Sequence, residues 1–161
     1  MKTAIYPGTF DPVTLGHLDI IERASAIFDR VVVTVARNPK KSPLFTAEER
    51  VAMIREVTTH LTNVTCESFE GLVVDFARQA GAQALIRGLR AVSDFEYELQ
   101  MAHVNRRLHN QLVTVVLMPG EKYTYLNSTI VKEVATFGGD IAAFVSPSVM
   151  ARLHAKLAVQ K

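Results

Sequence analysis

Residues 31–36 read VVVTVA, a run of mostly β-branched residues in which apolar and polar positions do not alternate. Such a run is typical of a strand that is buried on both faces, as in parallel sheets covered by helices on both sides. Four further strands are predicted at 3–6, 64–69, 84–86 and 112–118. The stretch therefore predicts one member of a five-stranded parallel sheet.

Helical patterns fill the segments between these strands. From His17 to Phe28 apolar residues recur at helical spacing, and Thr46 with Glu49 forms a capping box that opens a second helix. Further helices are expected over 71–80, 93–108, 128–137 and 147–158. This alternation predicts an α/β fold, a doubly wound sheet of Rossmann-like type. No repeat or linker divides the chain, so we expect a single domain over 1–161.

Composition excludes several classes of protein. The chain has 161 residues, 48% of them hydrophobic, which is too apolar for a disordered protein. Its one cysteine, Cys66, excludes an internal disulfide, and a net charge of +2 argues against a nucleic-acid partner. No uninterrupted apolar run of about 18 residues predicts a membrane span, and Pro7, Gly8 and Asp11 interrupt any signal peptide. We therefore expect a cytoplasmic protein without a membrane partner.

The residues that follow the strands indicate where a ligand binds, because open α/β sheets bind ligands at the carboxyl ends of their strands. Glycines, hydroxyls, cations and a histidine follow four of the predicted strands, in the segments 7–17, 37–41, 87–90 and 123–129. Together they predict a site for an anionic ligand at this edge of the sheet. The sequence contains no Walker motif and no G-x-G-x-x-G loop.

His17 is expected in the first turn of a helix, where free N–H groups and the helix dipole favour an anion. There the helix should lower the pKa of the imidazole and keep it neutral, as a hydrogen-bond donor to phosphate. The alternative is that His17 only caps the helix. The segment 127–129 has the same two interpretations, a phosphate-binding helix end or a simple N-cap.

The basic residues also allow two interpretations. Arg37, Lys40 and Lys41 form either a phosphate-binding segment or a solvated loop. Arg87 and Arg90 bind phosphate, or they pair with the nearby acids Asp94 and Glu98. No metal-ligand spacing is present, so we expect no protein metal site.

Five motifs together resemble the bacterial phosphopantetheine adenylyltransferases. They are YPGTFDP at 6–12, TLGH at 14–17, LIRGLR at 85–90, DFEYE at 94–98 and NSTIVKE at 127–133. The T-x-G-H element alone indicates only the wider nucleotidylyltransferase superfamily. The sequence departs from the family at Asn127, where a serine is usual, and at Tyr123, where a tryptophan is common.

The resemblance implies a nucleotidyltransferase-type fold and reversible transfer of adenylate from ATP to 4′-phosphopantetheine. The products are dephospho-coenzyme A and pyrophosphate, the reaction uses Mg²⁺, and it is the penultimate step of coenzyme A synthesis. Family members are typically homohexamers. We expect direct in-line attack without a covalent intermediate, because the acceptor phosphate is already anionic.

The resemblance also assigns site residues. It implies ATP contacts at Thr9, Phe10, His17, Gly88, Leu89, Arg90, Glu98, Tyr123, Thr124, Tyr125, Leu126, Asn127, Ser128 and Thr129. It implies contacts with 4′-phosphopantetheine at Thr9, Lys41, Val73 and Arg87. We expect His17 and Lys41 at the α-phosphate and Arg90 at the β/γ end as catalytic residues, although spacing does not distinguish Lys40 from Lys41. Rival functions are transfer to nicotinamide mononucleotide or glycerol phosphate, and nucleotide binding without turnover.

Overall fold

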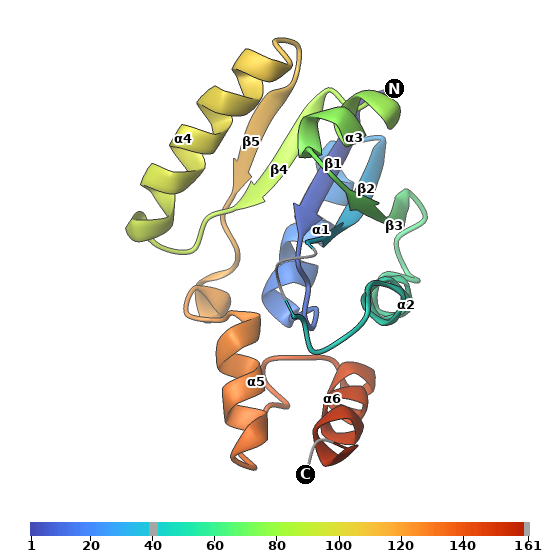
Figure 1. Cartoon of the computed structure of the whole chain (residues 1–161), viewed down its shortest axis with the longest axis vertical. Coiled ribbons are helices and arrows are strands. Elements are labelled where there is room, and N and C mark those ends of the chain that lie inside the picture. The colour runs from blue at the N-terminus through green and yellow to red at the C-terminus, as the bar shows by residue number, and fades with distance from the viewer. Residues whose placement is uncertain (39–41, 160–161) are drawn as a thin grey trace.

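The sheet at the centre of the molecule has five strands, all parallel, in the order β3-β2-β1-β4-β5 (Figure 1). The computed structural model describes residues 1–38 and 42–159. The strands are β1 (Thr3–Gly8), β2 (Arg30–Arg37), β3 (Val64–Glu70), β4 (Ala84–Gly88) and β5 (Val113–Leu117). The predicted α/β fold with a five-stranded parallel sheet is confirmed.

Within the described residues, six helices surround the sheet, four along its two faces and the last two beyond the carboxyl ends of its strands (Figure 1). They are α1 (Leu15–Ile27), α2 (Ala47–Val57), α3 (Val73–Gln79), α4 (Val92–Leu108), α5 (Ser128–Thr136) and α6 (Pro147–Val159). Val31, Val33 and Val35 of β2 face the core that α1 and α2 complete, whereas Val32 packs with α3 on the other side. This burial of alternate residues on opposite faces explains why the stretch 31–36 is apolar throughout.

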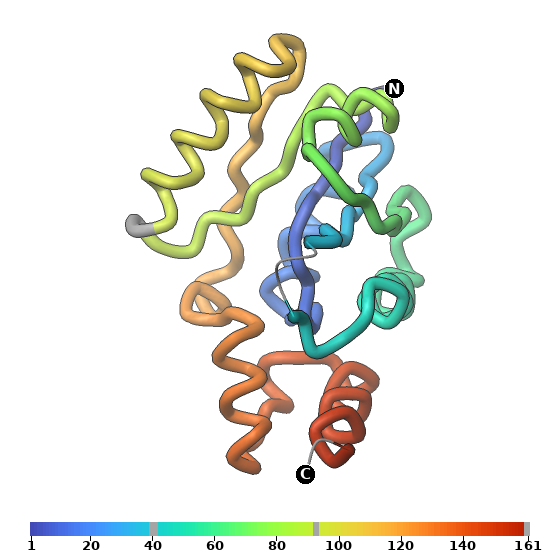
Figure 2. Tube along the Cα trace, viewed as in Figure 1, coloured from blue at the N-terminus to red at the C-terminus, as the bar shows by residue number. Residues whose placement is uncertain are grey.

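The order of the strands indicates where a ligand site is expected in this sheet. The chain runs outward from β1 to β2 and β3 on one side, and then returns to place β4 and β5 on the other. The carboxyl ends of β1 and β4 therefore lie side by side where the winding reverses, which is the usual ligand position in such sheets. Figure 2 shows the chain leaving β5 at this edge and continuing into α5, which lies with α6 beyond the strand ends.

The element boundaries differ from expectation mainly at strand ends. The strand expected at 3–6 extends further, because Pro7 and Gly8 also belong to β1 and lie in register with Thr34 and Val35 of β2. Proline fits here because residue 7 faces β4, whose pairing with β1 ends at Ile5, and the Pro7 carbonyl accepts from Arg87 instead. Gly8 leaves room for the ring of Phe10. A short 3₁₀ helix at Glu121–Tyr123, which the sequence pattern did not predict, precedes α5.

Candidate active site

A pocket of about 290 Å³ opens at the carboxyl ends of β1 and β4. It is lined by Tyr6, Pro7, Gly8, Thr9, Phe10, Thr14, Gly16, His17, Ile20, Arg87, Gly88, Arg90, Asp94, Glu98, Pro119, Tyr123, Leu126, Asn127 and Ser128. The wall therefore combines the end of β1, the start of α1, the segment from β4 into α4, and the start of α5. The structure brings three of the four predicted segments together, 7–17, 87–90 and 123–129. Arg37, from the fourth segment, lines a different pocket and pairs with Glu48.

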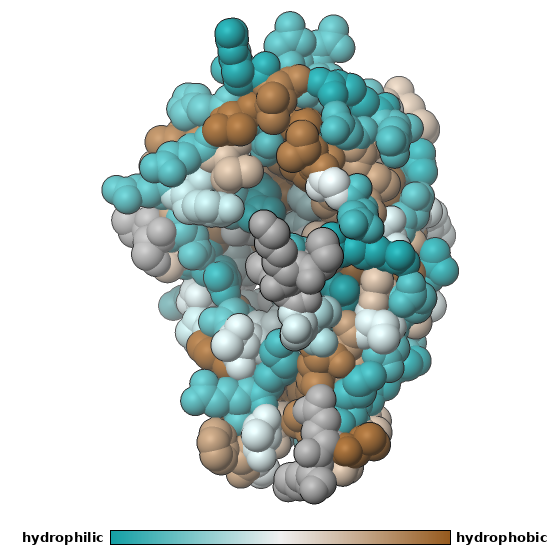
Figure 3. All heavy atoms as spheres, in the orientation of Figure 1, coloured by the Kyte–Doolittle hydropathy of each residue, from teal (hydrophilic) through white to brown (hydrophobic). Residues whose placement is uncertain are grey.

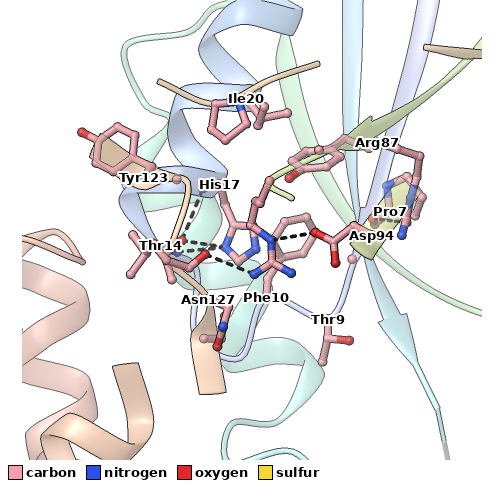
Figure 4. A pocket seen from close by; sticks show the side chains of 18 of the residues that line it. Pro7, Thr9, Phe10, Thr14, His17, Ile20, Arg87, Asp94, Tyr123 and Asn127 are labelled. Atoms are coloured by element: carbon pink, nitrogen blue, oxygen red, sulfur yellow. Dashed lines mark hydrogen bonds and ion pairs between the residues drawn. The ribbon is translucent and has the colours of Figure 1, made fainter. Parts of the chain in front are cut away.

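The start of α1 fixes the position of His17 (Figure 4). The hydroxyl of Thr14 accepts a hydrogen bond from the His17 backbone N–H, while the imidazole Nδ1 accepts one from the Thr14 backbone N–H at 3.0 Å. Because Nδ1 is an acceptor, the neutral ring carries its proton on Nε2. The capping interpretation of His17 is thus correct for Nδ1, and it leaves Nε2–H as a donor for a ligand.

The imidazole of His17 is neutral at ordinary pH. Burial against the pocket wall, with a further contribution from the positive charge of Arg90, lowers the pKa of His17 to about 4. The predicted direction of the pKa shift is confirmed, and its causes are desolvation and a neighbouring cation. A neutral Nε2–H can donate to a phosphate oxygen without losing a proton.

The turn after β1 shapes the floor of the pocket. Phe10 has a φ of +49°, and its ring packs edge-on against the imidazole of His17 at 5.0 Å between centroids. A Cβ added to Gly8 would lie 2.9 Å from the Phe10 ring, so the backbone and the ring approach each other only because residue 8 is glycine. Thr9, between them, is exposed at the pocket mouth.

The two arginines that follow β4 are paired with acids of α4. Arg87 donates from Nε and Nη2 to Glu98 at 2.7 and 2.6 Å, and Arg90 Nε lies 3.5 Å from Asp94. The ion-pair interpretation of the two arginines is therefore correct for this structure, and phosphate binding by them stays a prediction. Burial lowers the pKa of Arg87, but hydrogen bonds and the charge of Glu98 outweigh burial, and the pKa lies above its ordinary value.

The start of α5 closes the far side of the pocket. The side chain of Asn127 accepts from the Ile130 N–H at 2.9 Å, so it caps α5, and the Ser128 hydroxyl donates to the Pro12 carbonyl at 2.7 Å. Tyr123 and Leu126 also line the pocket. Of the expected nucleotide contacts, four lie outside this lining: Leu89, Thr124, Tyr125 and Thr129. Leu89 and Thr124 line a neighbouring apolar pocket, and Tyr125 packs edge-on against Phe144.

A second pocket, of about 120 Å³, lies between β4, α3 and α4. Val73, expected at the acceptor, lines it together with Arg87, which also lines the larger pocket. Asn105 lines it as well and is 6% exposed. In the described part of the chain no side-chain partner is found for the Asn105 amide, and its place in a helical pattern gave no signal that would have singled it out.

Several lining residues were not predicted individually. Tyr6 and Thr14 lie inside the quoted motifs, so the motifs were the signal, but their side chains suggested no role by themselves. Asp94 was named from sequence only as a possible ion-pair partner. Asp11 is another residue near the site to which the sequence assigned no role. Its buried carboxylate accepts from the backbone N–H groups of Leu44 and Phe45 and from Lys132 Nζ at 2.7 Å.

Lys41, expected at the α-phosphate and the acceptor, lies outside the described residues, and so does Lys40.

Within residues 1–38 and 42–159, no cluster of three His, Cys, Asp or Glu side chains has the arrangement of a metal site. No helix in the same ranges combines the length and apolarity of a membrane span.

Comparison with known proteins gives one consistent family. Residues 5–134 match the cytidylyltransferase-like family model. The chain is 54% identical over 156 residues to a phosphopantetheine adenylyltransferase of Heliobacterium modesticaldum, covering 97% of this chain and 93% of the relative.

Two solved structures share the fold at low sequence identity. One is assigned as a nicotinate-nucleotide adenylyltransferase of Vibrio parahaemolyticus, with a TM-score of 0.72, 20% identity, and coverage of 100% of this chain and 98% of that one. The other is a lipopolysaccharide core biosynthesis protein of Thermoplasma volcanium, with a TM-score of 0.54, 22% identity, and coverage of 74% and 97%.

Proposed function

Because this chain belongs to the phosphopantetheine adenylyltransferases, within the cytidylyltransferase-like family, we propose that it transfers adenylate from ATP to 4′-phosphopantetheine. The products are dephospho-coenzyme A and pyrophosphate, and the reaction is reversible. It is the penultimate step of coenzyme A synthesis, and we place it in the cytoplasm. The observation that carries the proposal is the grouping of a neutral Nε2–H donor and two arginines around one pocket at the strand ends.

The larger pocket suits the nucleotide. Its floor is the turn at Thr9 and Phe10, its wall is His17, and its rim carries Arg90 and the start of α5. Helix starts and backbone N–H groups favour the phosphates, while Pro119, Tyr123 and Leu126 offer apolar surface to a base.

The smaller pocket suits the acceptor. Pantetheine is a flexible chain with two amides, and Val73 offers apolar contact while the buried Asn105 amide offers a hydrogen-bonding partner. Arg87 lies in the wall that both pockets share. An acceptor phosphate held at Arg87 would therefore face the nucleotide, with its pantetheine arm in the smaller pocket.

Charge neutralisation and alignment account for the chemistry. The acceptor phosphate is an anion and needs no general base, but it must approach the anionic α-phosphate. Repulsion between two unit charges at such distances is roughly 4 kcal/mol at an effective dielectric near 20. We assign His17 Nε2–H to the α-phosphoryl oxygens and Arg90 to the β/γ end, with Lys41 as a third donor. In-line displacement then expels pyrophosphate directly.

Both arginines of the pocket form ion pairs before a substrate binds. Arg87 is paired with Glu98, and Arg90 is paired with Asp94. When a phosphate binds, its oxygens replace the carboxylate as the partner of the arginine. The acids thus keep both cations oriented in the pocket wall. This exchange costs less than desolvating an unpaired arginine.

The described residues do not form a cage for Mg²⁺, since the two carboxylates in the pocket are both paired with arginines. We propose that Mg²⁺ enters with ATP, bound mainly through its phosphates. When bound there, it neutralises the charge of the pyrophosphate. No protein ligand is assigned to it.

We also propose that the chain assembles with copies of itself, as a homohexamer. Among the α4 side chains that the structure describes, only Asn105 is buried, and Phe95, Leu99, Val104 and Leu108 are exposed. A helix of this length gains most of its stability from packing an apolar face, so α4 requires a partner surface. Figure 3 shows apolar side chains gathered at the end of the molecule that carries α3 and α4.

A panel of nucleotides and acceptors tests the proposed function. We expect pyrophosphate release with ATP and 4′-phosphopantetheine, and little with CTP or with nicotinamide mononucleotide or glycerol phosphate as acceptor. Equal turnover with one of the other acceptors would assign the chain to a different substrate. Tight ATP binding without turnover on any acceptor would favour a binding module.

A further inference from the structure

Arg50 of α2 is 3% exposed, yet no described carboxylate lies within ion-pair distance of its guanidinium. Its hydrogen bonds all go to backbone carbonyl oxygens. Nε donates to Phe45 and Thr46 at 3.1 and 3.2 Å, and Nη1 donates to Thr9 and Ala36 at 2.8 and 3.2 Å. A buried cation satisfied by carbonyls of four residues holds those backbone segments in a fixed arrangement.

Two of these carbonyls belong to neighbouring strand ends. Thr9 directly follows β1, and Ala36 lies near the end of β2. Arg50 lines a pocket of about 180 Å³ on one side of Thr9, and Thr9 also lines the 290 Å³ pocket of the candidate active site. Arg50 therefore lies behind the turn that forms the active-site floor, without lining that site itself.

The bond to Thr9 fixes the direction of a peptide group. The peptide between Thr9 and Phe10 is trans, so its N–H points opposite to its C=O. With the Thr9 carbonyl directed to Arg50, the Phe10 N–H is directed away from Arg50. This N–H has no hydrogen-bond partner among the described residues, although Phe10 itself is only 2% exposed and lines the active-site pocket.

We propose that Arg50 is a positioning residue for the nucleotide. By holding the Thr9 carbonyl, it turns the Phe10 N–H toward a phosphate of the bound nucleotide and keeps it there. An unpaired amide of a buried pocket residue is a donor in need of an acceptor, and a phosphate oxygen supplies one. This inference rests on the proposed adenylyl transfer.

The shape of the arginine side chain matters to this role. Its planar guanidinium reaches the Thr9 and Ala36 carbonyls from one nitrogen while Nε remains bonded to its own helix start. A lysine has one ammonium group and no second, fixed donor position. Arg50→Lys is therefore expected to retain the charge but hold the turn poorly.

The same helix provides a matched control. Arg55 Nη2 donates to the Cys66 carbonyl of β3 at 2.9 Å, so it also ties α2 to a strand, but it lines none of the pockets described here. Arg55→Met removes a comparable hydrogen bond far from the active site. Its stability loss calibrates a purely structural effect.

The test measures ATP affinity by calorimetry without acceptor, and KM for ATP during turnover, in wild type, Arg50→Met, Arg50→Lys and Arg55→Met. A loss of folded protein lowers the number of active sites but leaves Kd and KM unchanged. We expect both Arg50 variants to raise Kd and KM for ATP at least about tenfold, the size of one lost hydrogen bond to a charged group. Arg55→Met should stay within about twofold of wild type on the same scale.

The folding and the ATP affinity of the variants together decide whether Arg50 positions the nucleotide. If Arg50→Met does not fold, as judged by the absence of a cooperative melting transition, Arg50→Lys carries the comparison alone. Normal ATP affinity in a folded Arg50 variant, or equal changes in Arg55→Met, overturns the proposal. Wild-type turnover is scored separately, so failure of the proposed function shows as an inactive wild type and not as an altered ATP affinity.

Discussion

His17 has two hydrogen-bonding nitrogens with separate duties. Nδ1 accepts from the Thr14 N–H within the helix cap, and Nε2 remains available to the pocket. The sequence presented capping and phosphate binding as alternatives, whereas the structure allows one ring to do both. Substitutions that keep the hydrogen-bonding group of one nitrogen and remove that of the other therefore test which nitrogen is needed for turnover.

An asparagine at position 17 places its amide group near the Nδ1 position and has nothing at Nε2. We expect His17→Asn to keep the cap but to lower kcat about 10²–10³-fold, as for loss of a transition-state donor. His17→Gln, whose amide nitrogen reaches the Nε2 position, should retain more activity than His17→Ala. Steady-state kinetics at saturating substrates check this, and a near-normal kcat in His17→Asn would show that His17 is only a cap.

The depressed pKa of His17 also makes stability depend on pH. The folded state keeps the ring neutral down to about pH 4, whereas the unfolded chain binds a proton below its ordinary pKa of 6.5. The unfolded state binds more protons between these values, so stability falls as the pH drops from 6.5 to 4. From pH 7 to 5 this group should contribute a loss of about 1–2 kcal/mol.

Urea unfolding of His17→Gln at both pH values measures that contribution. The variant should lose less stability on acidification than wild type, by the amount just given, with the exposed His103→Gln as control. If wild type and His17→Gln lose equal stability, the imidazole is not held neutral by its surroundings.

At the scale of elements, Asp11 joins three parts of the chain. Its carboxylate binds the N–H groups of Leu44 and Phe45 ahead of α2, and it pairs with Lys132 of α5. The first turn, the approach to α2 and the helix α5 are thus fixed to one another around the pocket. Because Asp11 is buried and Lys132 is half-buried, we expect the Asp11 side chain to contribute more to the free energy of unfolding than the Lys132 side chain.

Asp11→Asn keeps the shape but removes the charge and one acceptor. We expect it to lower the free energy of unfolding by about 2–3 kcal/mol, the range for hydrogen bonds to a charged group. Lys132→Met should cost less, because Asp11 then keeps both backbone donors. Denaturant unfolding of the two variants checks the order, and a larger loss in Lys132→Met would contradict it.

Elements were easier to predict than pairings. The strand at 31–36 and the capping box at Thr46 follow from local pattern, and the structure confirms both. The sequence offered Glu98 as a partner of Arg87, 11 positions away, but it did not decide between that acid and a phosphate. Arg50 and Thr9 are 41 positions apart, and no local pattern specifies that pair. The strand-end rule located the pocket, but it gave no reason to single out Asn105 or Arg50, whose roles depend on tertiary packing.

At the scale of the whole molecule, the edge formed by α4 and β5 is incompletely covered. Val113 and Val116 of β5 are exposed, as are the apolar residues of α4 named above. One further copy of the chain is the simplest cover for such a surface, and repetition of the contact around a symmetry axis would produce the proposed hexamer.

Val104 of α4 is 50% exposed, and a charge there should disfavour association. We expect wild type to sediment at about six times the 17.8 kDa mass of the chain, and Val104→Asp to shift toward smaller species. Ile27→Asp, at an exposed apolar position at the end of α1, is the control and should leave the mass unchanged. A wild-type chain that sediments as a monomer at micromolar concentration would remove this part of the proposal.

In the proposed reaction, adenylate passes from ATP directly to 4′-phosphopantetheine in the strand-end pocket. The most direct measurement is pyrophosphate release at saturating ATP and Mg²⁺, with 4′-phosphopantetheine as the varied substrate and the product identified by mass. We expect saturable release that depends on the acceptor, with one dephospho-coenzyme A formed for each pyrophosphate. Release that is the same with and without the acceptor, or no release at all, would show that this chain does not catalyse the transfer.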